Sequence, residues 1–248
     1  MRNFILALLC FLSHSTYSDT LKIATGEYPP WTSESLPHYG YINQIVAEAF
    51  KQEGIDVEFH FMPWKRALEA TRMGHYHASS YWGDEVEGHQ EFYRSEVLHT
   101  EPFVFFYRKS LAPLTWKQLA NLSEFAIGAT RGYSYTEEFW AMAHEDRLRV
   151  AISDDDLTSM QRLVEGKLDL FPISQATGMY LLKHHFKPEQ AQLIDVSPHP
   201  LNTNKDFILF SREIPENKTY LEAFNRGLKK LKSENKLELF LKAALSQD

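Results

Sequence analysis

The sequence predicts an α/β protein built as two lobes with a cleft between them. Strand-like and helix-like segments alternate along the chain with short connections, which is typical of mainly parallel sheets covered by helices. The alternation starts again midway, and strand-like segments cross between the halves near Lys109 and near Pro198–Pro200. We therefore expect a first lobe of residues 19–108 plus 200–248, a second lobe of residues 109–199, and hinges at the two crossings.

The expected elements of the first half follow from apolar periodicity and from turn residues. A helix follows Gly40 and keeps its apolar side chains on one face until Gly54. Another begins after Pro63 and is stopped by Gly74. The run Phe103–Tyr107 is apolar throughout, which indicates a buried strand. The expected strands are residues 21–25, 57–62, 77–81 and 102–109, and the second helix covers residues 64–73.

The second half repeats the alternation, with capping residues before its helices. Ser134 and Glu137 form a capping box for a helix that reaches about residue 144, and Asp155 or Asp156 caps the next helix. The expected strands are residues 125–129, 149–153, 168–173, 193–196 and 207–210. The other expected helices are a short one after Thr115, residues 176–186 and residues 220–244.

Residues 1–18 have the features of a cleavable secretory leader. They contain a positive charge, an apolar run too short to span a membrane, and small residues before an expected cleavage at Asp19. The only cysteine, Cys10, leaves with this leader, and the bulky Leu9 before it disfavours a lipid anchor. We expect a protein exported to the periplasm, without disulfides or thiol chemistry.

The charge balance excludes nucleic acid as an expected partner. The chain has 26 basic and 33 acidic residues, a formal net charge of −7, and no basic cluster beyond Lys229–Lys230. Aromatic residues make up 14% of the chain, which leaves some for a site as well as for a core. We expect a monomer that binds a small-molecule solute and needs no cofactor.

The most informative stretch follows the first strand. It ends in a turn that contains two prolines and displays Glu27, Tyr28 and Trp31. Ligands of α/β sheets bind beyond the carboxyl ends of the strands, and prolines reduce the freedom that such a turn loses on binding. The turn therefore suits the wall of a ligand cleft. The alternative is that Tyr28 and Trp31 only cap the hydrophobic core.

Four segments of the chain resemble the type 2 periplasmic solute-binding proteins of bacterial family 3, the amino-acid-binding-like group. These segments are Ala24–Trp31, Gly40–Tyr41, Met62–Ala67 and Ile127–Ser134, in the same order and at similar separations. The resemblance covers essentially the whole chain after the leader. It implies two lobes, the second inserted into the first, that close by hinge bending around a small polar solute for an ABC transporter or a sensory partner.

The chain departs from this family at both charged anchors of an amino-acid site. Family members usually hold the α-carboxylate with an arginine after the third strand, where this chain has His89. They usually hold the ammonium group with an aspartate in lobe two, where this chain has Ser174. The resemblance therefore supports the fold and leaves the ligand open.

A second candidate for ligand contact lies between a strand and a helix in the second half. Thr130, Arg131, Tyr133 and Ser134 offer two hydroxyls, a guanidinium and a phenol next to a helix N-terminus, which suits an anion. The alternative is a helix cap with an exposed arginine. We expect Arg131 to hold an acidic group of the solute.

Further aromatic residues follow the second and third strands. Trp64, Tyr81 and Trp82 belong to the edge where Tyr28 also emerges, and aromatic faces attract planar or cationic groups. For Trp64, core packing is the favoured alternative, whereas Trp82, which is flanked by Gly83 and acidic residues, is expected to face the cleft. Arg66 either pairs with Glu69 or reaches the cleft.

A metal site and a catalytic site are the less favoured hypotheses. His75 and His77 would share a face of a strand, but no further ligands occur at a recognised zinc spacing. Residues 154–156 are acidic and are more simply a helix cap and a complement to the helix dipole. Because Glu27 lies at the expected cleft, a dehydratase-like enzyme of the same fold stays an alternative function. Because of the histidines, a metal or metal-chelate carrier stays another. The favoured reading is a binding protein, not an enzyme, for a small anionic or polar solute with a planar or apolar portion.

Overall fold

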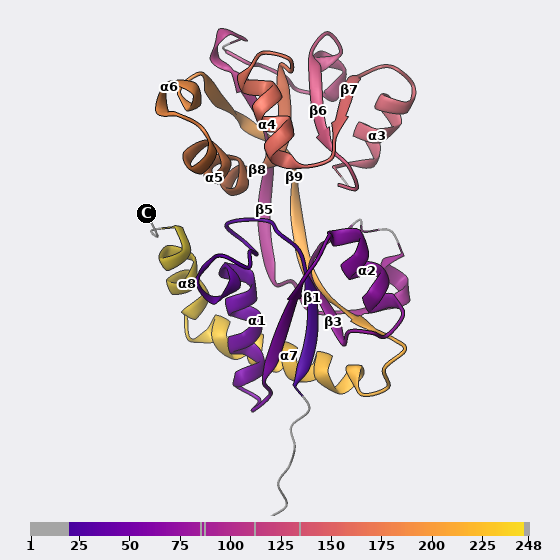
Figure 1. The fold of residues 1–248 in the computed structure, drawn as a ribbon. Helices are drawn as coiled ribbons and strands as arrows, with labels where there is room; N and C mark the ends of the chain where they lie inside the picture. Colours follow the sequence, from indigo (N-terminus) through magenta and orange to yellow (C-terminus); the bar gives the residue numbers. More distant parts are fainter. Residues whose placement is uncertain (1–19, 85, 87, 112, 134, 246–248) are drawn as a thin grey trace, which may run out of the picture.

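The computed structural model describes residues 20–245 except residues 85, 87, 112 and 134. The chain forms two lobes stacked end to end, and the long strands β5 and β9 run from one lobe into the other (Figure 1). The expected leader lies outside the described residues. Within these residues, no helix combines the length and apolar character that crossing a membrane requires.

The strands belong to one continuous sheet of nine strands in the order β2-β1-β3-β9-β5-β8-β6-β7, with β4 on β9. In the first lobe β1 is parallel to β2 and β3, and in the second β6 is parallel to β7 and β8. The antiparallel pair β5 and β9 joins the two halves. The strands are β1 (Leu21–Thr25), β2 (Val57–Phe61), β3 (Ala78–Gly83), β4 (Phe92–Arg94), β5 (His99–Arg108), β6 (Ala126–Thr130), β7 (Arg149–Ser153), β8 (Leu170–Ser174) and β9 (Ile194–Ser211).

Helices cover both faces of the sheet in each lobe. In the first lobe Ile208 and Phe210 of β9 join the cluster packed by α1 and α7, whereas Leu209 between them packs with Leu68 of α2. Alternate residues of a strand point to opposite faces, so α2 lies on the other face from α1 and α7. The helices are α1 (Tyr41–Lys51), α2 (Trp64–Arg72), α3 (Glu137–His144), α4 (Asp156–Val164), α5 (Gln175–His185), α6 (Pro188–Ala191), α7 (Asn217–Ser233) and α8 (Lys236–Leu245). Short 3₁₀ helices cover Pro37–Tyr39, His89–Glu91, Lys109–Leu111 and Leu119–Leu122.

The expected fold class is confirmed, and most of the expected elements form within a few residues of their predicted bounds. One expectation about β9 is wrong. The strands predicted at residues 193–196 and 207–210 are parts of a single strand that continues through Pro200. The register between β5 and β9 is irregular there, and a proline that cannot donate a hydrogen bond is tolerated at such a place.

Two helix boundaries also differ from the expectations. The last helical segment is interrupted at Asn235, which has a φ of 53°, so α7 and α8 are separate helices. The helix α3 starts later than the expected capping box, because Thr136 is its N-cap and accepts a hydrogen bond from the backbone of Phe139 at 3.0 Å. Ser134 lies outside the described residues.

Candidate functional site

The turn after β1 presents Tyr28 and Trp31 toward the second lobe. Thr32 closes this turn by donating its hydroxyl to the carbonyl of Gly26 at 2.8 Å. Gly40 has a φ of 93°, and a Cβ there would lie 2.5 Å from the carbonyl oxygen of Trp31. Only glycine allows this close approach, so the lead into α1 fixes the turn in place.

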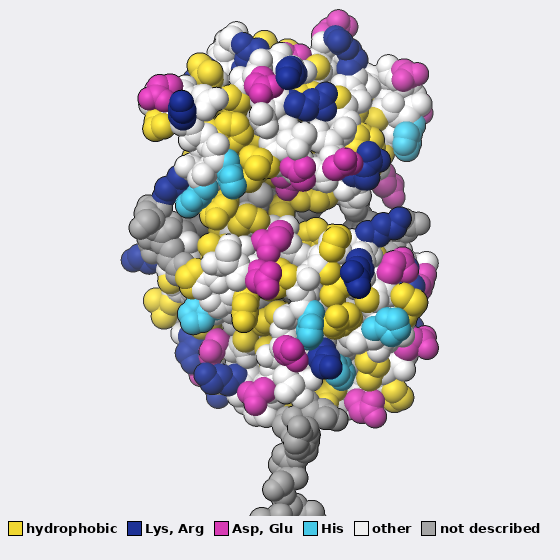
Figure 2. All heavy atoms as spheres, viewed as in Figure 1, with side chains coloured by type: hydrophobic (Ala, Val, Ile, Leu, Met, Phe, Trp, Pro, Cys, Tyr) yellow, Lys and Arg dark blue, Asp and Glu magenta, His cyan; other side chains and the backbone are white. Residues whose placement is uncertain are grey.

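Side chains from both lobes meet at this turn. The indole nitrogen of Trp31 donates to the hydroxyl of Ser174, at the end of β8, at 3.2 Å. The rings of Tyr28 and Tyr133 pack edge to face with centroids 6.1 Å apart. Hydrophobic side chains gather along the waist between the lobes, which is hollowed in the space-filling view (Figure 2). Residues of the first and second lobe thus form one aromatic site at the crossing.

Two carboxylates lie within this site. Glu101 on β5 and Asp206 on β9 are only 2% and 4% exposed. Tyr81 donates its hydroxyl to Glu101 at 3.0 Å, and the same oxygen of Tyr81 lies 2.8 Å from Nδ1 of His99. When Tyr81 donates its single proton to an ionised Glu101, its oxygen can only accept from His99, and this arrangement requires the tautomer of His99 that is protonated on Nδ1. The bonds form a chain from His99 through Tyr81 to Glu101.

Burial controls the protonation of these groups. Burial, and then the nearby charge of Asp206, raise the pKa of Glu101 to about 8. Burial also raises the pKa of Asp206 to about 7, although the adjacent Tyr81 hydroxyl acts in the opposite direction. Burial lowers the pKa of His99 to about 4, so this ring is neutral near pH 7. Among the described residues, this region therefore holds two acids and no cationic side chain of its own.

The second lobe contributes a third acid, Asp156. It accepts a hydrogen bond from the Thr130 hydroxyl at 2.6 Å and another from the Tyr133 hydroxyl at 2.7 Å. Burial raises the pKa of Asp156 to about 6, and these two hydrogen bonds lower it in part. The interpretation of residues 154–156 as a helix cap and dipole complement is confirmed, because Asp155 is the N-cap of α4 and Asp156 lies in the first turn of that helix. The capping role belongs to Asp155, which accepts a bond from the backbone of Thr158 at 2.7 Å.

Solved structures share this architecture, whereas neither protein-family profiles nor curated proteins match the sequence. A histidine kinase sensor domain with similarity to periplasmic binding proteins aligns with a TM-score of 0.76 and 15% identity, over 92% of this chain and 96% of that one. An ancestral arginine-binding protein bound to arginine aligns with a TM-score of 0.73 and 17% identity, over 90% of this chain and 97% of that one.

A third solved structure is an ancestral amino-acid-binding protein described as a precursor of cyclohexadienyl dehydratase. It aligns with a TM-score of 0.71 and 17% identity, over 92% of this chain and 95% of that one. This chain has the fold of two-lobed periplasmic binding proteins. The resemblance expected from the sequence is confirmed for the fold. Sequence identities of 15–17% establish a shared fold and no more.

The structure brings some of the expected site residues together and leaves others apart. Those that the structure brings together at the crossing are Tyr28, Trp31, Tyr81, Thr130, Tyr133 and Ser174. Arg131 lies apart, because its side chain is 69% exposed and pairs with Asp154 at 2.8 Å. Ser134 is not among the described residues.

Glu27, Trp64 and Trp82 form a separate arrangement in the first lobe. Trp64 donates its indole hydrogen to the carbonyl of the exposed Glu27 at 3.1 Å. The rings of Trp64 and Trp82 pack edge to face at 5.3 Å, and Trp82 also contacts the small cluster that contains Leu209. Core packing, expected for Trp64, thus describes Trp82 as well, which was expected to face the cleft.

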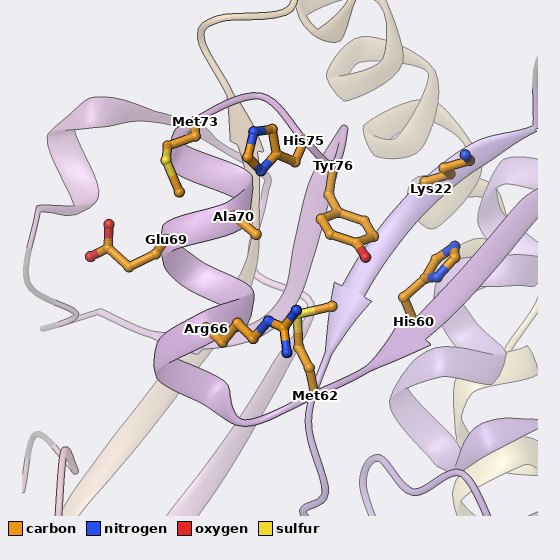
Figure 3. Close-up of a pocket in the computed structure, with 9 residues that line it drawn as sticks. All are labelled: Lys22, His60, Met62, Arg66, Glu69, Ala70, Met73, His75 and Tyr76. Carbon is orange, nitrogen blue, oxygen red and sulfur yellow. The ribbon is translucent and has the colours of Figure 1, made fainter.

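A pocket of about 350 Å³ lies on the first lobe, between α2 and the strands β1 and β2 (Figure 3). Arg66 points into this pocket, whereas Glu69 points away and pairs with Arg72. His75 also lines the pocket, while His77 accepts a hydrogen bond from the backbone of Lys22 at 3.1 Å. In the part of the chain that the structure describes, no group of three metal-ligating side chains occurs.

The acids of the site were the residues that sequence reasoning missed. Glu101 stands directly before the expected strand at residue 102, and Asp206 directly before the expected strand at residue 207. An acidic residue adjoining a strand that must be buried on both faces is itself a signal. No local sequence pattern predicts the antiparallel register that brings β5 and β9 together.

Proposed function

We propose that this protein is an exported receptor that captures a small solute between its lobes and closes around it by hinge bending. The observation that carries the proposal is that both lobes supply side chains to one site at their crossing, as in the bond from Trp31 to Ser174. Pockets formed between two bodies are the preferred place for small ligands. The two-lobed fold, shared with known binding proteins, supports the same function.

The strand pairing suggests where the hinge lies. Residues 100–102 of β5 pair only with residues 203–205 of β9, because β8 pairs with β5 from Phe103 onward and β3 pairs with β9 from Asp206 onward. A ribbon of two strands bends more easily than a wide sheet. We place the hinge in this ribbon, and the lobe boundaries there in preference to Lys109 and Pro198–Pro200.

Small-angle scattering and thermal unfolding test the proposed function. A solute from a broad panel of amino acids, amines, carboxylates and sugars should compact the molecule and raise its melting temperature. At 100 times the dissociation constant, a ligand adds about 2.7 kcal/mol to the free energy of unfolding. If no solute changes either measurement, the receptor function is wrong.

The same panel separates the alternatives. A binding protein returns the solute unchanged, whereas an enzyme of this fold releases a product, which mass spectrometry of the incubated solutes detects. A metal carrier loses stability when a chelator is added. The partner, an ABC permease or a membrane sensor, is identified by which membrane protein retains the loaded receptor in a pull-down.

A further inference from the structure

We propose that the solute is a small organic cation without a carboxylate, such as an amine or a guanidine, whose charged nitrogen binds Glu101 and Asp206. This inference rests on the proposed function and adds the chemical class of the ligand. The sequence predicted a small anionic or polar solute, and the present inference is a cation in place of an anion.

The first argument is that the two carboxylates lack a positive partner. By distance and angle, Oε2 of Glu101 and Oδ2 of Asp206 accept no hydrogen bond from the described residues, although the Ser174 hydroxyl and the Trp31 indole lie near enough to Glu101 to lower its pKa in part. Neither carboxylate pairs with a lysine or arginine among the described residues. The nearest basic nitrogen is Nδ1 of His99, 3.9 Å from Asp206, and it is already bonded to Tyr81. A buried acid without a partner is costly, so a site that keeps two of them is suited to a cation.

The second argument is that the surrounding surface is aromatic. The ring centroid of Tyr28 lies 6.3 Å from that of Tyr81 and 6.1 Å from that of Tyr133. The ring centroids of Trp31 and His99 lie 4.5 Å apart. Aromatic faces attract cations, most strongly where water is excluded. The acids and the rings therefore favour the same kind of ligand.

The third argument concerns the groups that would bind a carboxylate. Arg131 is exposed and paired with Asp154, and Arg66 lines the pocket on the first lobe. The N-termini of α4 and α5 are capped by Asp155 and Ser174, which already accept hydrogen bonds from backbone N–H groups. A carboxylate near Glu101 would thus add a further negative charge without a counter-ion.

Where the cation enters follows from the contacts between the lobes. Trp31 is bonded to Ser174 and Tyr28 packs on Tyr133, so the lobes must separate before a solute reaches the acids. Glu101 lies in the hinge ribbon itself, paired with Asn204. A cation bound there would contact both lobes and the strands that join them.

The test uses isothermal titration calorimetry with pairs of solutes, each made of a cation and a related compound that carries a carboxylate. The pairs are agmatine and arginine, choline and betaine, and butylamine and butyrate. We expect at least one cation to bind about tenfold or more tightly than its carboxylate counterpart. Glu101→Gln and Asp206→Asn should each weaken that binding about tenfold to a hundredfold, the range for a lost charge-assisted hydrogen bond. Glu189→Gln, which removes the same charge from the exposed surface of α6, should leave it unchanged.

The variants are informative because the amide oxygen introduced by Glu101→Gln can still accept the Tyr81 hydroxyl, and circular dichroism confirms that they fold. Tighter binding of the carboxylate member of every pair overturns the inference, as does binding that neither substitution affects. Binding that a chelator abolishes identifies a metal ion as the ligand and also overturns it. In these cases the receptor function stands, whereas the absence of binding and compaction with every solute contradicts that function as well.

Discussion

At the scale of single residues, the acids at the crossing make the unliganded protein less stable than its core allows. Glu101 and Asp206 are nearly excluded from water, and burial raises the pKa of both carboxyls. Enzymes and receptors often keep such unfavourable groups because the ligand compensates them. The cost should therefore be visible in the pH dependence of stability.

Replacing Glu101 by glutamine should flatten the fall in stability between about pH 5 and pH 8. A carboxyl whose folded pKa is raised stabilises the protein fully below its unfolded pKa of about 4, and this contribution is lost as the pH rises through the folded value of about 8. Asp206 and Asp156 act in the same direction, since their pKa values are raised to about 7 and about 6. His99, with its pKa lowered to about 4, acts oppositely between about pH 4 and pH 6.5.

Urea unfolding of the unliganded protein at about pH 5 and about pH 8 measures this effect. The free energy of unfolding of Glu101→Gln should exceed that of the parent protein by on the order of 2 kcal/mol at the higher pH, and the two should differ little at the lower pH. Glu189→Gln is the control, because it changes a carboxylate on the exposed surface. Equal pH slopes for Glu101→Gln and the parent would show that Glu101 is ionised in both states throughout this range.

At the scale of helices and strands, local patterns predicted elements well and long-range pairing poorly. The strand β1 and the helices α1 and α2 follow from apolar periodicity with glycine and proline at their ends. The strand β9 was predicted as two strands, because prolines usually end a strand. Its irregular pairing with β5 tolerates these prolines, and no local sequence pattern reports that register. The same register pairs Glu101 with Asn204 and His99 with Asp206, which makes the two acids diagonal neighbours. The acids of the site were therefore missed for the same reason.

Helix packing in the first lobe depends on Gly227 of α7. A Cβ at this position would lie 2.0 Å from the carbonyl oxygen of Ala49 in α1, and a backbone atom cannot move aside as a side chain can. Gly227→Ala should therefore destabilise the protein by about 1–3 kcal/mol, although alanine favours a helix more than glycine does. Thermal unfolding compares it with Lys229→Ala, an exposed change on the same helix. A gain in stability for Gly227→Ala would mean that α1 and α7 are farther apart.

At the scale of the whole molecule, the proposed hinge bending would have to break the contacts across the crossing. The bond from Trp31 to Ser174 joins the first lobe to the second. The bond from Trp116 to Ser197, 3.0 Å long, has the same donor and acceptor groups but lies within the second lobe. The two bonds form a matched pair, and under the proposed hinge bending only the bond from Trp31 would oppose opening.

Trp31→Phe should shift the unliganded protein toward an open form, whereas Trp116→Phe should not. Each substitution keeps an aromatic ring and removes one indole hydrogen bond, worth about 1 kcal/mol, which corresponds to about a fivefold change in an equilibrium constant. The Trp31 bond joins the two lobes, so its loss should shift the equilibrium between closed and open forms. The Trp116 bond does not join them, so only Trp31→Phe should increase the radius of gyration in small-angle scattering. Both variants should lose similar thermal stability, since both lose one bond. Equal radii for the two variants would mean that the Trp31 bond does not limit opening, and that the hinge ribbon around Glu101 sets the balance alone.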